Sequence, residues 1–232
     1  MITGGGSGVG ESIALALAAE GAKLCLVGRR LENLEVVAAK VAALGSSAAC
    51  CRVDLEQDDQ VLKLVQEVTA DVGGVDMLIH SAGTIERASI EAGSLRDFDS
   101  HYRVNVRAAY ALTQGLLPSL KSRRGEVVFI NSSSGITAKA FFSQYDASKH
   151  ALRALADSLR AEVNESGVRV LSIFLGQTAS NLQARLHDKE HKLYRPELLL
   201  QPDDVASAVV NALGLPRSAE ITDIHIRPMI KS

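Results

Sequence analysis

The sequence predicts an α/β protein built on one doubly wound, mainly parallel sheet with helices on both faces. Three observations support this fold class. Short apolar or β-branched runs alternate with longer segments of helical period, the alternation continues to the C-terminal end, and no Pro/Ser-rich linker divides the 232 residues. Repeated βα units form parallel sheets because each crossover helix returns the chain to the same end of the sheet. We therefore expect a single domain over residues 1–232.

Strands are expected in the short apolar runs. Six runs qualify by length and composition, and they lie at 23–27, 48–53, 76–80, 126–131, 168–175 and 221–226. Only Met1 and Ile2 precede Thr3 and the first glycines, whereas a central strand normally has about five residues. A first strand at that position is expected to be very short.

Amphipathic helices are expected between the strands. Two of these segments keep apolar residues three and four positions apart, namely Leu31, Leu34, Val37, Val41 and Leu44, then Val61, Leu64, Val65, Val68 and Val72. Gly21 and Gly45 follow two helical patterns, where a left-handed residue commonly ends a helix. The stretch 177–202 is irregular and long for a connection, so we expect a mobile substrate lid there.

The composition excludes several classes of protein. Hydrophobic residues make up 47% and charged residues 22%, which is ordinary for a globular domain. A net charge of −2 without blocks of like charge argues against nucleic-acid binding. No apolar run approaches a membrane span and the start does not resemble a signal peptide, so a cytoplasmic location is expected. Cys50 and Cys51 point to opposite faces of a predicted strand, and the three cysteines are expected to be free core thiols.

The glycine-rich run Thr3-Gly4-Gly5-Gly6-Ser7-Gly8-Val9-Gly10 leads directly into a helical pattern. Glycines permit a tight turn and a close approach to a pyrophosphate, whose charge then lies at the positive N-terminus of the helix. No Gly-Lys-Ser/Thr follows, which disfavours a nucleoside-triphosphate loop; a flexible terminal loop remains the alternative. At the head of a βα unit the run predicts a dinucleotide site with the contacts Gly4, Gly6, Ser7, Gly8, Val9 and Gly10.

Tyr145 and Lys149 lie four residues apart on one face of a predicted helix. A tyrosine exchanges protons near neutrality only if its pKa falls by roughly two to three units, and a nearby cation acts in that direction. Just upstream, Ser132-Ser133-Ser134-Gly135 follows a predicted strand, at the edge where doubly wound sheets bind ligands. Taken alone, the Tyr-x-x-x-Lys spacing is common on helix surfaces, and the serines also suit a simple turn.

Together these residues resemble the short-chain dehydrogenase/reductase family, in its single-domain branch, over nearly the whole chain. The run from Thr3 to Gly10 is similar to the family's Thr-Gly-x-x-x-Gly-x-Gly loop, and Tyr145 with Lys149 is similar to its catalytic pair. Ser132 lies 13 positions before Tyr145, which is the spacing of the family serine. The resemblance implies a Rossmann-like sheet.

The resemblance also implies the roles of the side chains. Tyr145 would protonate a carbonyl oxygen as hydride arrives, or deprotonate the alcohol in reverse, while Ser132 orients that oxygen. Lys149 would lower the pKa of Tyr145 and bind the nicotinamide ribose. Asn105 matches the family asparagine that connects the lysine to solvent through a water molecule. The cofactor would carry the redox chemistry.

Several positions depart from the family pattern. His80-Ser81-Ala82-Gly83 stands in place of Asn-Asn-Ala-Gly, and His80 is interpreted as a structural hydrogen-bonding residue rather than a second acid or base. Ala82 and Gly83 still permit the backbone to approach a cofactor closely. Leu175-Gly176 replaces Pro-Gly, so the nicotinamide end of the site, with Gly176 and Thr178, matches the family less well.

The second predicted strand indicates which cofactor is bound. It ends in Gly28-Arg29-Arg30, with no carboxylate before Glu32. An acidic residue here binds the 2′-hydroxyl of NAD, whereas an arginine accommodates the 2′-phosphate of NADP. We therefore expect NADP(H) to be preferred over NAD(H), with Arg29 as the main contact; solvated residues at a helix start are the alternative. The family resemblance implies that Asp54, with Leu55, lies near the adenine; the alternative is that Asp54 caps the next helix.

The predicted lid is rich in charged residues. Between Arg185 and Arg195 the formal charge is +2, which either attracts an acidic group of the substrate or belongs to a solvated helix face. His187 and His191 lie four residues apart, but no third ligand is evident and no metal is expected.

We expect an NADPH-dependent reductase or alcohol dehydrogenase that acts on a small carbonyl/alcohol pair. The alternatives are a 3-oxoacyl thioester reductase, which needs a surface for an acyl carrier, and a non-catalytic NADP(H)-binding regulator. By resemblance, helices around residues 105–117 and 145–163 would pair in a homodimer or homotetramer. Small residues suited to such contacts are Ala108, Ala109, Ala111, Ala151, Ala154 and Ala156.

Overall fold

The computed structural model describes residues 1–230, whose seven strands form one sheet. The strands are β1 (Ile2–Thr3), β2 (Leu24–Gly28), β3 (Ala48–Arg52), β4 (Met77–His80), β5 (Glu126–Ser132), β6 (Arg169–Leu175) and β7 (Asp223–Ile226). All neighbours pair in parallel, in the order β3-β2-β1-β4-β5-β6-β7. The predicted α/β fold class is confirmed.

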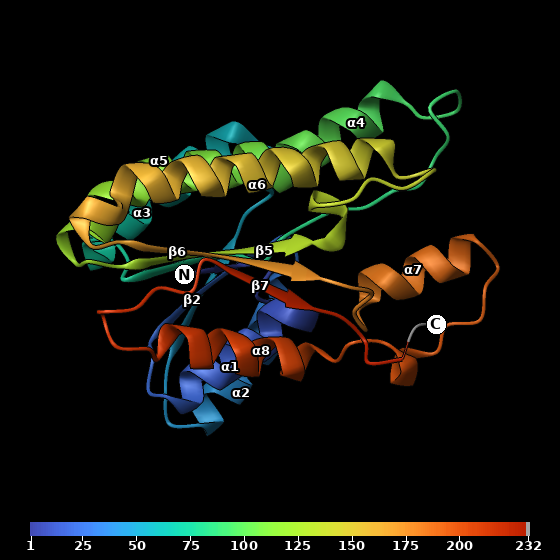
Figure 1. Cartoon of the computed structure of the whole chain (residues 1–232). Coiled ribbons are helices and arrows are strands. Elements are labelled where there is room, and N and C mark those ends of the chain that lie inside the picture. The colour runs from blue at the N-terminus through green and yellow to red at the C-terminus, as the bar shows by residue number, and fades with distance from the viewer. Residues whose placement is uncertain (231–232) are drawn as a thin grey trace.

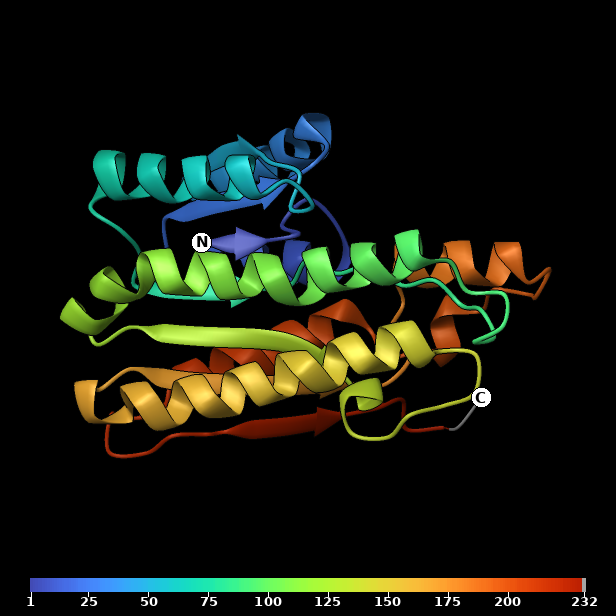
Figure 2. The same cartoon turned by 90° about the horizontal axis from the view of Figure 1, so that it is seen from above.

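Helices cover both faces of this sheet. They are α1 (Gly8–Ala19), α2 (Leu31–Ala43), α3 (Asp58–Val72), α4 (Leu95–Tyr102), α5 (Ala108–Ser122), α6 (Ser143–Val163), α7 (Asn181–Lys189) and α8 (Pro202–Leu213). Figure 1 shows α3, α5 and α6 on one face and α1, α2 and α8 on the other, with α7 beyond the carboxyl ends of the strands. Seen from above in Figure 2, α3, α5 and α6 lie side by side over the sheet.

The sheet separates two apolar layers. Phe129, Leu112 and Leu64 are fully buried between the sheet and the α3, α5 and α6 layer, whereas Ile13 and Val209 are fully buried on the opposite side. Successive strand residues point to opposite faces, so each central strand contributes side chains to both layers. This burial on two sides explains why the strands read as continuous apolar runs.

The strand prediction agrees with the structure to within two residues at each end. Gly21 and Gly45 have φ angles of 84° and 81°, which confirms the left-handed helix ends. The cysteines are free and half-buried; Cys25 and Cys51 face the α3 side, and Cys50 faces the α2 side, as strand alternation requires. No helix within residues 1–230 is long and apolar enough to cross a membrane.

The segment 177–202 differs from the prediction, because it is not irregular throughout. It contains α7 and a short 3₁₀ turn, Pro196–Leu198. Its two ends are joined at the base, where the Leu200 N–H donates to the Gln177 carbonyl (3.0 Å) and the Ala179 N–H donates to the Leu200 carbonyl (2.9 Å). Leu186, Leu199 and Leu200 are buried, so the segment is packed against the domain at defined points.

Candidate active site

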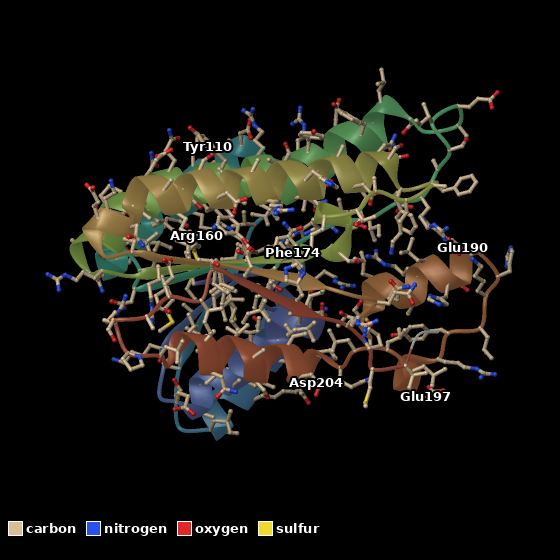
Figure 3. The ribbon with its side chains drawn as sticks, viewed as in Figure 1. Tyr110, Arg160, Phe174, Glu190, Glu197 and Asp204 are labelled. Atoms are coloured by element: carbon tan, nitrogen blue, oxygen red, sulfur yellow. The ribbon has the colours of Figure 1, made fainter. Side chains whose placement is uncertain are left out.

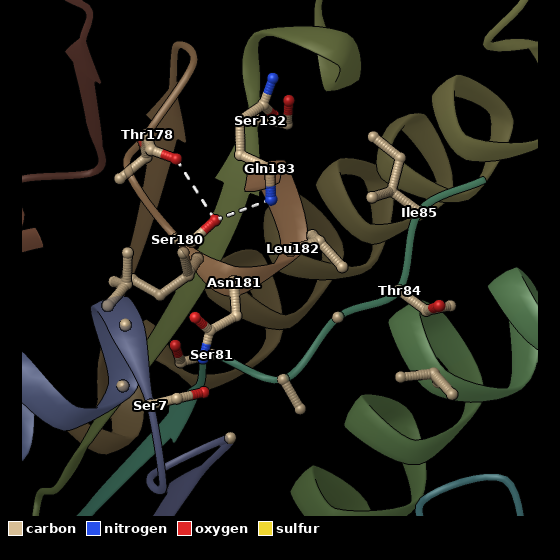
Figure 4. A pocket seen from close by; sticks show the side chains of 18 of the residues that line it. Ser7, Ser81, Thr84, Ile85, Ser132, Thr178, Ser180, Asn181, Leu182 and Gln183 are labelled. Atoms are coloured by element: carbon tan, nitrogen blue, oxygen red, sulfur yellow. Dashed lines mark hydrogen bonds between the residues drawn. The ribbon is translucent and has the colours of Figure 1, made fainter. Parts of the chain in front are cut away.

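A pocket of about 570 Å³ opens at the carboxyl ends of the strands. Its centre lies where β1 and β4 are neighbours and the chain departs in opposite directions, the position at which doubly wound sheets bind ligands. Figure 4 shows the pocket between Ser7 of the glycine-rich loop, Ser81 and Thr84 after β4, and the α7 segment. Of the predicted site residues, all except Asn105 line this pocket.

The glycine-rich loop is packed closely against the end of β4 and against the start of α1. Gly4 has a φ of 69°, and a Cβ at this position would lie 2.9 Å from Ala82. At Gly10 a Cβ would lie 2.3 Å from the Gly4 carbonyl oxygen, so α1 can pack against the loop only with glycine there. The Thr3 hydroxyl accepts hydrogen bonds from the N–H groups of Ser81 (3.1 Å) and Ala82 (3.2 Å), which ties the loop to the end of β4.

The N-terminus of α1 is available to an anion. Ser7 is the extended N-cap residue of this helix, yet its side chain makes no capping hydrogen bond. Gly6, Gly8 and Val9 line the pocket beside it. The first N–H groups of a helix carry partial positive charge, so this end of the pocket fits a pyrophosphate.

The end of the pocket that is predicted to hold the adenosine carries two arginines. Arg29 and Arg30 follow β2 and are exposed, and Asp54 and Leu55 follow β3. A second hollow, lined by Arg29, Arg52, Asp54 and Gln60, adjoins this end, and Arg52 was not anticipated from the sequence. The Asp54 carboxylate accepts from the Glu56 N–H at 3.1 Å, while α3 begins at Asp58 with Gln57 as its N-cap. The interpretation of Asp54 as the cap of that helix is therefore wrong.

Tyr145, Lys149 and Ser132 converge in the centre of the pocket. Tyr145 and Lys149 project from α6 and are 9% and 4% exposed, and Ser132 ends β5. The Lys149 ammonium lies 5.8 Å from the centre of the Tyr145 ring and donates to the Ile130 carbonyl at 3.1 Å. Ser132 acts on the Tyr145 phenol in the direction that lowers its pKa. Ser133 and Ser134 belong to a 3₁₀ turn that also lines the pocket.

The proton affinities of this pair differ from the expectation. Burial raises the pKa of the Tyr145 phenol to about 12, against the opposing effect of Ser132. Burial also lowers the pKa of Lys149 to about 8, because no carboxylate compensates its charge. The expected lowering of the Tyr145 pKa by Lys149 is not found in the chain alone.

Asn105 lies behind the pocket rather than in it. It is 2% exposed and belongs to a π-helical turn, Arg103–Arg107, between α4 and α5. Its side-chain amide donates to the Thr84 carbonyl and the Ser148 hydroxyl, both at 3.0 Å, and accepts from the Thr84 N–H at 2.8 Å. Asn105 and Lys149 both lie close to Gly83, since a Cβ there would be 3.4 Å from the Asn105 Oδ1 and 3.9 Å from the Lys149 Nζ.

His80 joins β4 to α5. It is 4% exposed, forms a 2.9 Å hydrogen bond with Thr113, and stacks on Phe129 with ring centres 4.9 Å apart. Burial lowers its pKa to about 3, so the ring is neutral near pH 7. The geometry agrees with the interpretation of His80 as a structural hydrogen-bonding residue.

The end of the pocket that is predicted to hold the nicotinamide is formed by the segment after β6. Thr178 donates its hydroxyl proton to the Gly176 carbonyl at 3.0 Å, which closes a small turn. Ser180 then caps α7, its hydroxyl accepting from the Gln183 N–H at 3.2 Å (Figure 4). A serine directly before a helical segment is a recognised start signal, and it could have located α7 in the sequence.

Sequence reasoning missed the wall opposite the glycine-rich loop. Ile85, Phe142 and Leu186 pack with Tyr145 and Leu182 to form an apolar wall, which we define by these five residues. Charged side chains of the segment 177–202 also line the pocket beyond this wall. His187 is occupied by a 2.9 Å contact with the Gln183 carbonyl, and the described residues contain no group of three or more His, Cys, Asp or Glu arranged to hold a metal.

Comparison with known proteins agrees with this geometry. The sequence matches the family described as short chain dehydrogenase over residues 1–191. The chain belongs to the short-chain dehydrogenase/reductase family. It is 31% identical over 230 residues to an uncharacterized oxidoreductase of Staphylococcus aureus strain USA300, covering 99% of this chain and 96% of that protein.

Solved structures of short-chain dehydrogenases have the same fold. An alcohol dehydrogenase from the archaeon Thermococcus sibiricus, complexed with 5-hydroxy-NADP, superposes with a TM-score of 0.91 at 25% identity, covering 100% of this chain and 96% of that one. The closed form of a serine dehydrogenase with NADP⁺ gives a TM-score of 0.89 at 25% identity, covering 100% and 95%. This short-chain dehydrogenase/reductase is therefore an NAD(P)-dependent oxidoreductase.

Proposed function

We propose that this enzyme transfers hydride between NADPH and a small carbonyl or alcohol substrate, with Tyr145 as the general acid/base. The observation that carries the proposal is the convergence of Tyr145, Ser132 and Lys149 in a pocket that is continuous with the glycine-rich loop. The solved relatives named alcohol dehydrogenase and serine dehydrogenase support a carbonyl/alcohol pair as the substrate class.

The residues present fit a dinucleotide. The glycine cradle excludes any Cβ at Gly4 and Gly10, and the uncapped start of α1 suits the pyrophosphate. Arg29 and Arg30 would hold a 2′-phosphate, Asp54 and Leu55 would border the adenine, and Gly176 and Thr178 would border the nicotinamide. When bound, the cofactor supplies or accepts the hydride.

The chain's own groups would handle the proton. Ser132 orients the substrate oxygen, and the Tyr145 phenol donates its proton to that oxygen in reduction or accepts one in oxidation. Lys149 lies near the phenol and has a pKa of about 8, so near neutrality it is mostly charged and would bind the nicotinamide ribose. Asn105 forms hydrogen bonds with the Thr84 N–H and carbonyl groups, and it thereby fixes the position of the backbone beside Lys149.

The segment 177–202 would act as the lid over the substrate. Its ends are joined by backbone hydrogen bonds at Gln177, Ala179 and Leu200, so its outer part can move without disturbing the sheet. A lid closing over the site would exclude water during hydride transfer.

Replacing Tyr145 with phenylalanine tests the proposal. The ring remains, so NADPH should bind with little change, while turnover of a ketone and aldehyde panel should fall about 10²- to 10⁴-fold. Absorbance of NADPH reports turnover and its fluorescence reports binding. Tyr110→Phe is the matched control, because Tyr110 is exposed on α5 far from the pocket. Near wild-type turnover in Tyr145→Phe would contradict the assignment, and an inactive wild type that still binds NADPH would favour the regulator.

A further inference from the structure

A cluster of three charged side chains lies where the end of α7 meets the loop after β4. The Arg87 guanidinium donates to the Glu190 carboxylate, and the Lys192 ammonium lies 2.7 Å from the same carboxylate. Figure 3 shows Glu190 at the outer end of α7. Two cations therefore share one anion, and the cluster carries a net charge of +1. All three side chains line the pocket.

Arg87 is the member of this cluster with unused hydrogen-bonding capacity. Its guanidinium carbon lies 4.5 Å above the centre of the Phe142 ring, and its side chain is only 28% exposed. The Nε–H group is buried and has no acceptor among the described residues. A partly desolvated guanidinium that lines a pocket binds a planar carboxylate strongly, because several donors lie in one fork.

The apolar wall connects Arg87 to the reacting phenol. The ring centres of Phe142 and Tyr145 are 6.5 Å apart, so Arg87 and Tyr145 are both neighbours of the same phenylalanine. Ile85 and Leu186 complete this wall between them. A substrate lying along the wall would meet a proton donor at one end and a cation at the other.

The remaining charges at this end of the pocket are also positive. Lys139 and Arg185 line this end of the pocket. Among residues 1–230, Glu190 is the one residue with a carboxylate that lines the pocket beyond the apolar wall. Such an excess of cations attracts an anionic ligand before contact and strengthens its binding afterwards.

We propose that the substrate carries a carboxylate as well as the reacting carbonyl, and that Arg87 is the specificity-determining residue that binds this carboxylate. The proposal rests on the proposed function, because the carbonyl end is placed at Tyr145. The substrate class is then a short oxo acid and its hydroxy acid. The net charge of +1 on the cluster matches one carboxylate, whereas a dianionic phosphate would be left undercompensated.

A purely structural role for the cluster predicts different results. Glu86 with Lys189 (2.6 Å) and Arg87 with Glu190 form two neighbouring ion pairs that join the lid to the loop after β4. If Arg87 served only to hold the lid, Glu190→Gln and Arg87→Gln would impair every substrate alike. If Arg87 binds the substrate, Glu190→Gln removes its competitor and improves binding of acids.

The experiment compares each of three oxo acids with its methyl ester in the NADPH-loaded enzyme. The pairs are pyruvate, acetoacetate and 4-oxopentanoate with their methyl esters, which keep the carbonyl but carry no charge. We expect kcat/KM for at least one acid to exceed that of its ester by about tenfold or more. Arg87→Gln should lower kcat/KM for that acid about 10- to 100-fold through KM, and change its ester less than about twofold.

Two further variants complete the test. Glu190→Gln should lower KM for the acid, and Lys189→Gln, which breaks the neighbouring ion pair outside the pocket, should leave the acid-to-ester ratio unchanged. Equal losses for acid and ester in both Arg87→Gln and Glu190→Gln would overturn the proposal, as would a wild-type preference for every ester.

Calorimetry separates this inference from the proposed function. In the presence of NADP⁺ no carbonyl can be reduced, so binding of the three acids is measured without turnover. Binding that Arg87→Gln weakens supports the carboxylate site even if neither the acids, nor their esters, nor the ketone and aldehyde panel are reduced, in which case the proposed function fails alone. Reduction of the esters with no Arg87-dependent binding of any acid refutes the carboxylate site alone.

Discussion

The ammonium group of Lys149 is buried in the pocket, and its burial lowers the free energy of unfolding. Burial lowers its pKa from 10.5 to about 8, so folded chains bind this proton less readily than unfolded chains. Its contribution to stability therefore rises as pH increases from about 8 to 10.5, and it is lowest and constant below about 8. At about 1.4 kcal/mol per pKa unit, the cost below that range is roughly 3 kcal/mol.

Lys149→Met should therefore stabilise the protein without added cofactor while abolishing most activity. The variant loses the hydrogen bond to the Ile130 carbonyl, worth about 1 kcal/mol, so the net gain near pH 7 is roughly 2 kcal/mol. Urea unfolding at several pH values measures it, and the gain should shrink as pH approaches 10.5. Lys63→Met is the control, since Lys63 is exposed. A Lys149→Met protein less stable than wild type near pH 7 would refute this account.

Arg29 is the side chain that we propose decides the choice of cofactor. Charge-assisted hydrogen bonds contribute roughly 1.5 to 3 kcal/mol, so Arg29→Ala should lower NADPH affinity about 10- to 150-fold and change NADH affinity little. Fluorescence titration of both cofactors measures the ratio. Arg30→Ala should have the smaller effect, and tighter binding of NADH than of NADPH by wild type would show that the assignment is wrong.

The site residues that could be predicted from the sequence share one property. They come together because they are close to one another along the chain. Tyr145 and Lys149 meet because they lie one helical turn apart on α6, and the glycines meet the start of α1 because they precede it directly. Arg87 and Phe142 come from separate connections and meet only through the tertiary fold. No period or spacing relates their positions, so the apolar wall could not be predicted.

At the scale of elements, the close packing of α5 against α3 depends on a glycine at position 115. A Cβ on Gly115 of α5 would lie 2.5 and 3.0 Å from the two methyl groups of Val65 on α3 and 3.3 Å from its Cβ. Rotation of Val65 about χ1 cannot clear all three atoms. Alanine is the better helix former by about 1 kcal/mol, but overpacking typically costs 1 to 3 kcal/mol.

Gly115→Ala should therefore lower the free energy of unfolding, by roughly 1 kcal/mol. Adding Val65→Ala removes the obstructing methyl groups, so the double variant should be more stable than the sum of the two single changes predicts. Urea unfolding of the four proteins gives this coupling. Additive effects, or a single Gly115→Ala variant more stable than wild type, would contradict the packing argument.

Two elements were missed for physical reasons. The π-helical turn Arg103–Arg107 is a local insertion into a helical pattern whose apolar spacing barely changes, so the sequence predicts an ordinary helix around residues 105–117. The helix α7 has a single fully buried side chain, Leu186, and therefore shows almost no apolar period. Strands and long helices were found because each buries a regular series of side chains.

At the scale of the whole molecule, we propose that copies pair through the outer surface of α5 and α6. Three of the predicted contact residues, Ala108, Ala109 and Ala156, are buried in the chain's own core and are not available, which corrects that part of the expectation. Ala154 is exposed, and Tyr110, labelled in Figure 3, is 51% exposed on α5.

Light scattering at micromolar concentration should give the mass of a dimer or tetramer. Ala154→Glu places a charge on the proposed interface and should shift that mass toward the monomer, whereas Lys63→Glu on α3 should not. A monomeric wild type would refute the assembly.

The parallel sheet also determines when the glycine-rich loop can acquire its shape. The loop takes its form from two partners distant in sequence, Val27, whose carbonyl accepts from the Gly4 N–H at 2.8 Å, and Ala82, whose N–H donates to Thr3. A parallel sheet contains no hairpins, so each of these pairings must close a long loop of chain during folding. The glycine-rich loop therefore takes its final shape only after β2 and β4 have paired with β1. A cofactor can stabilise only chains that have already assembled the middle of the sheet, and it slows their unfolding more than it speeds their folding.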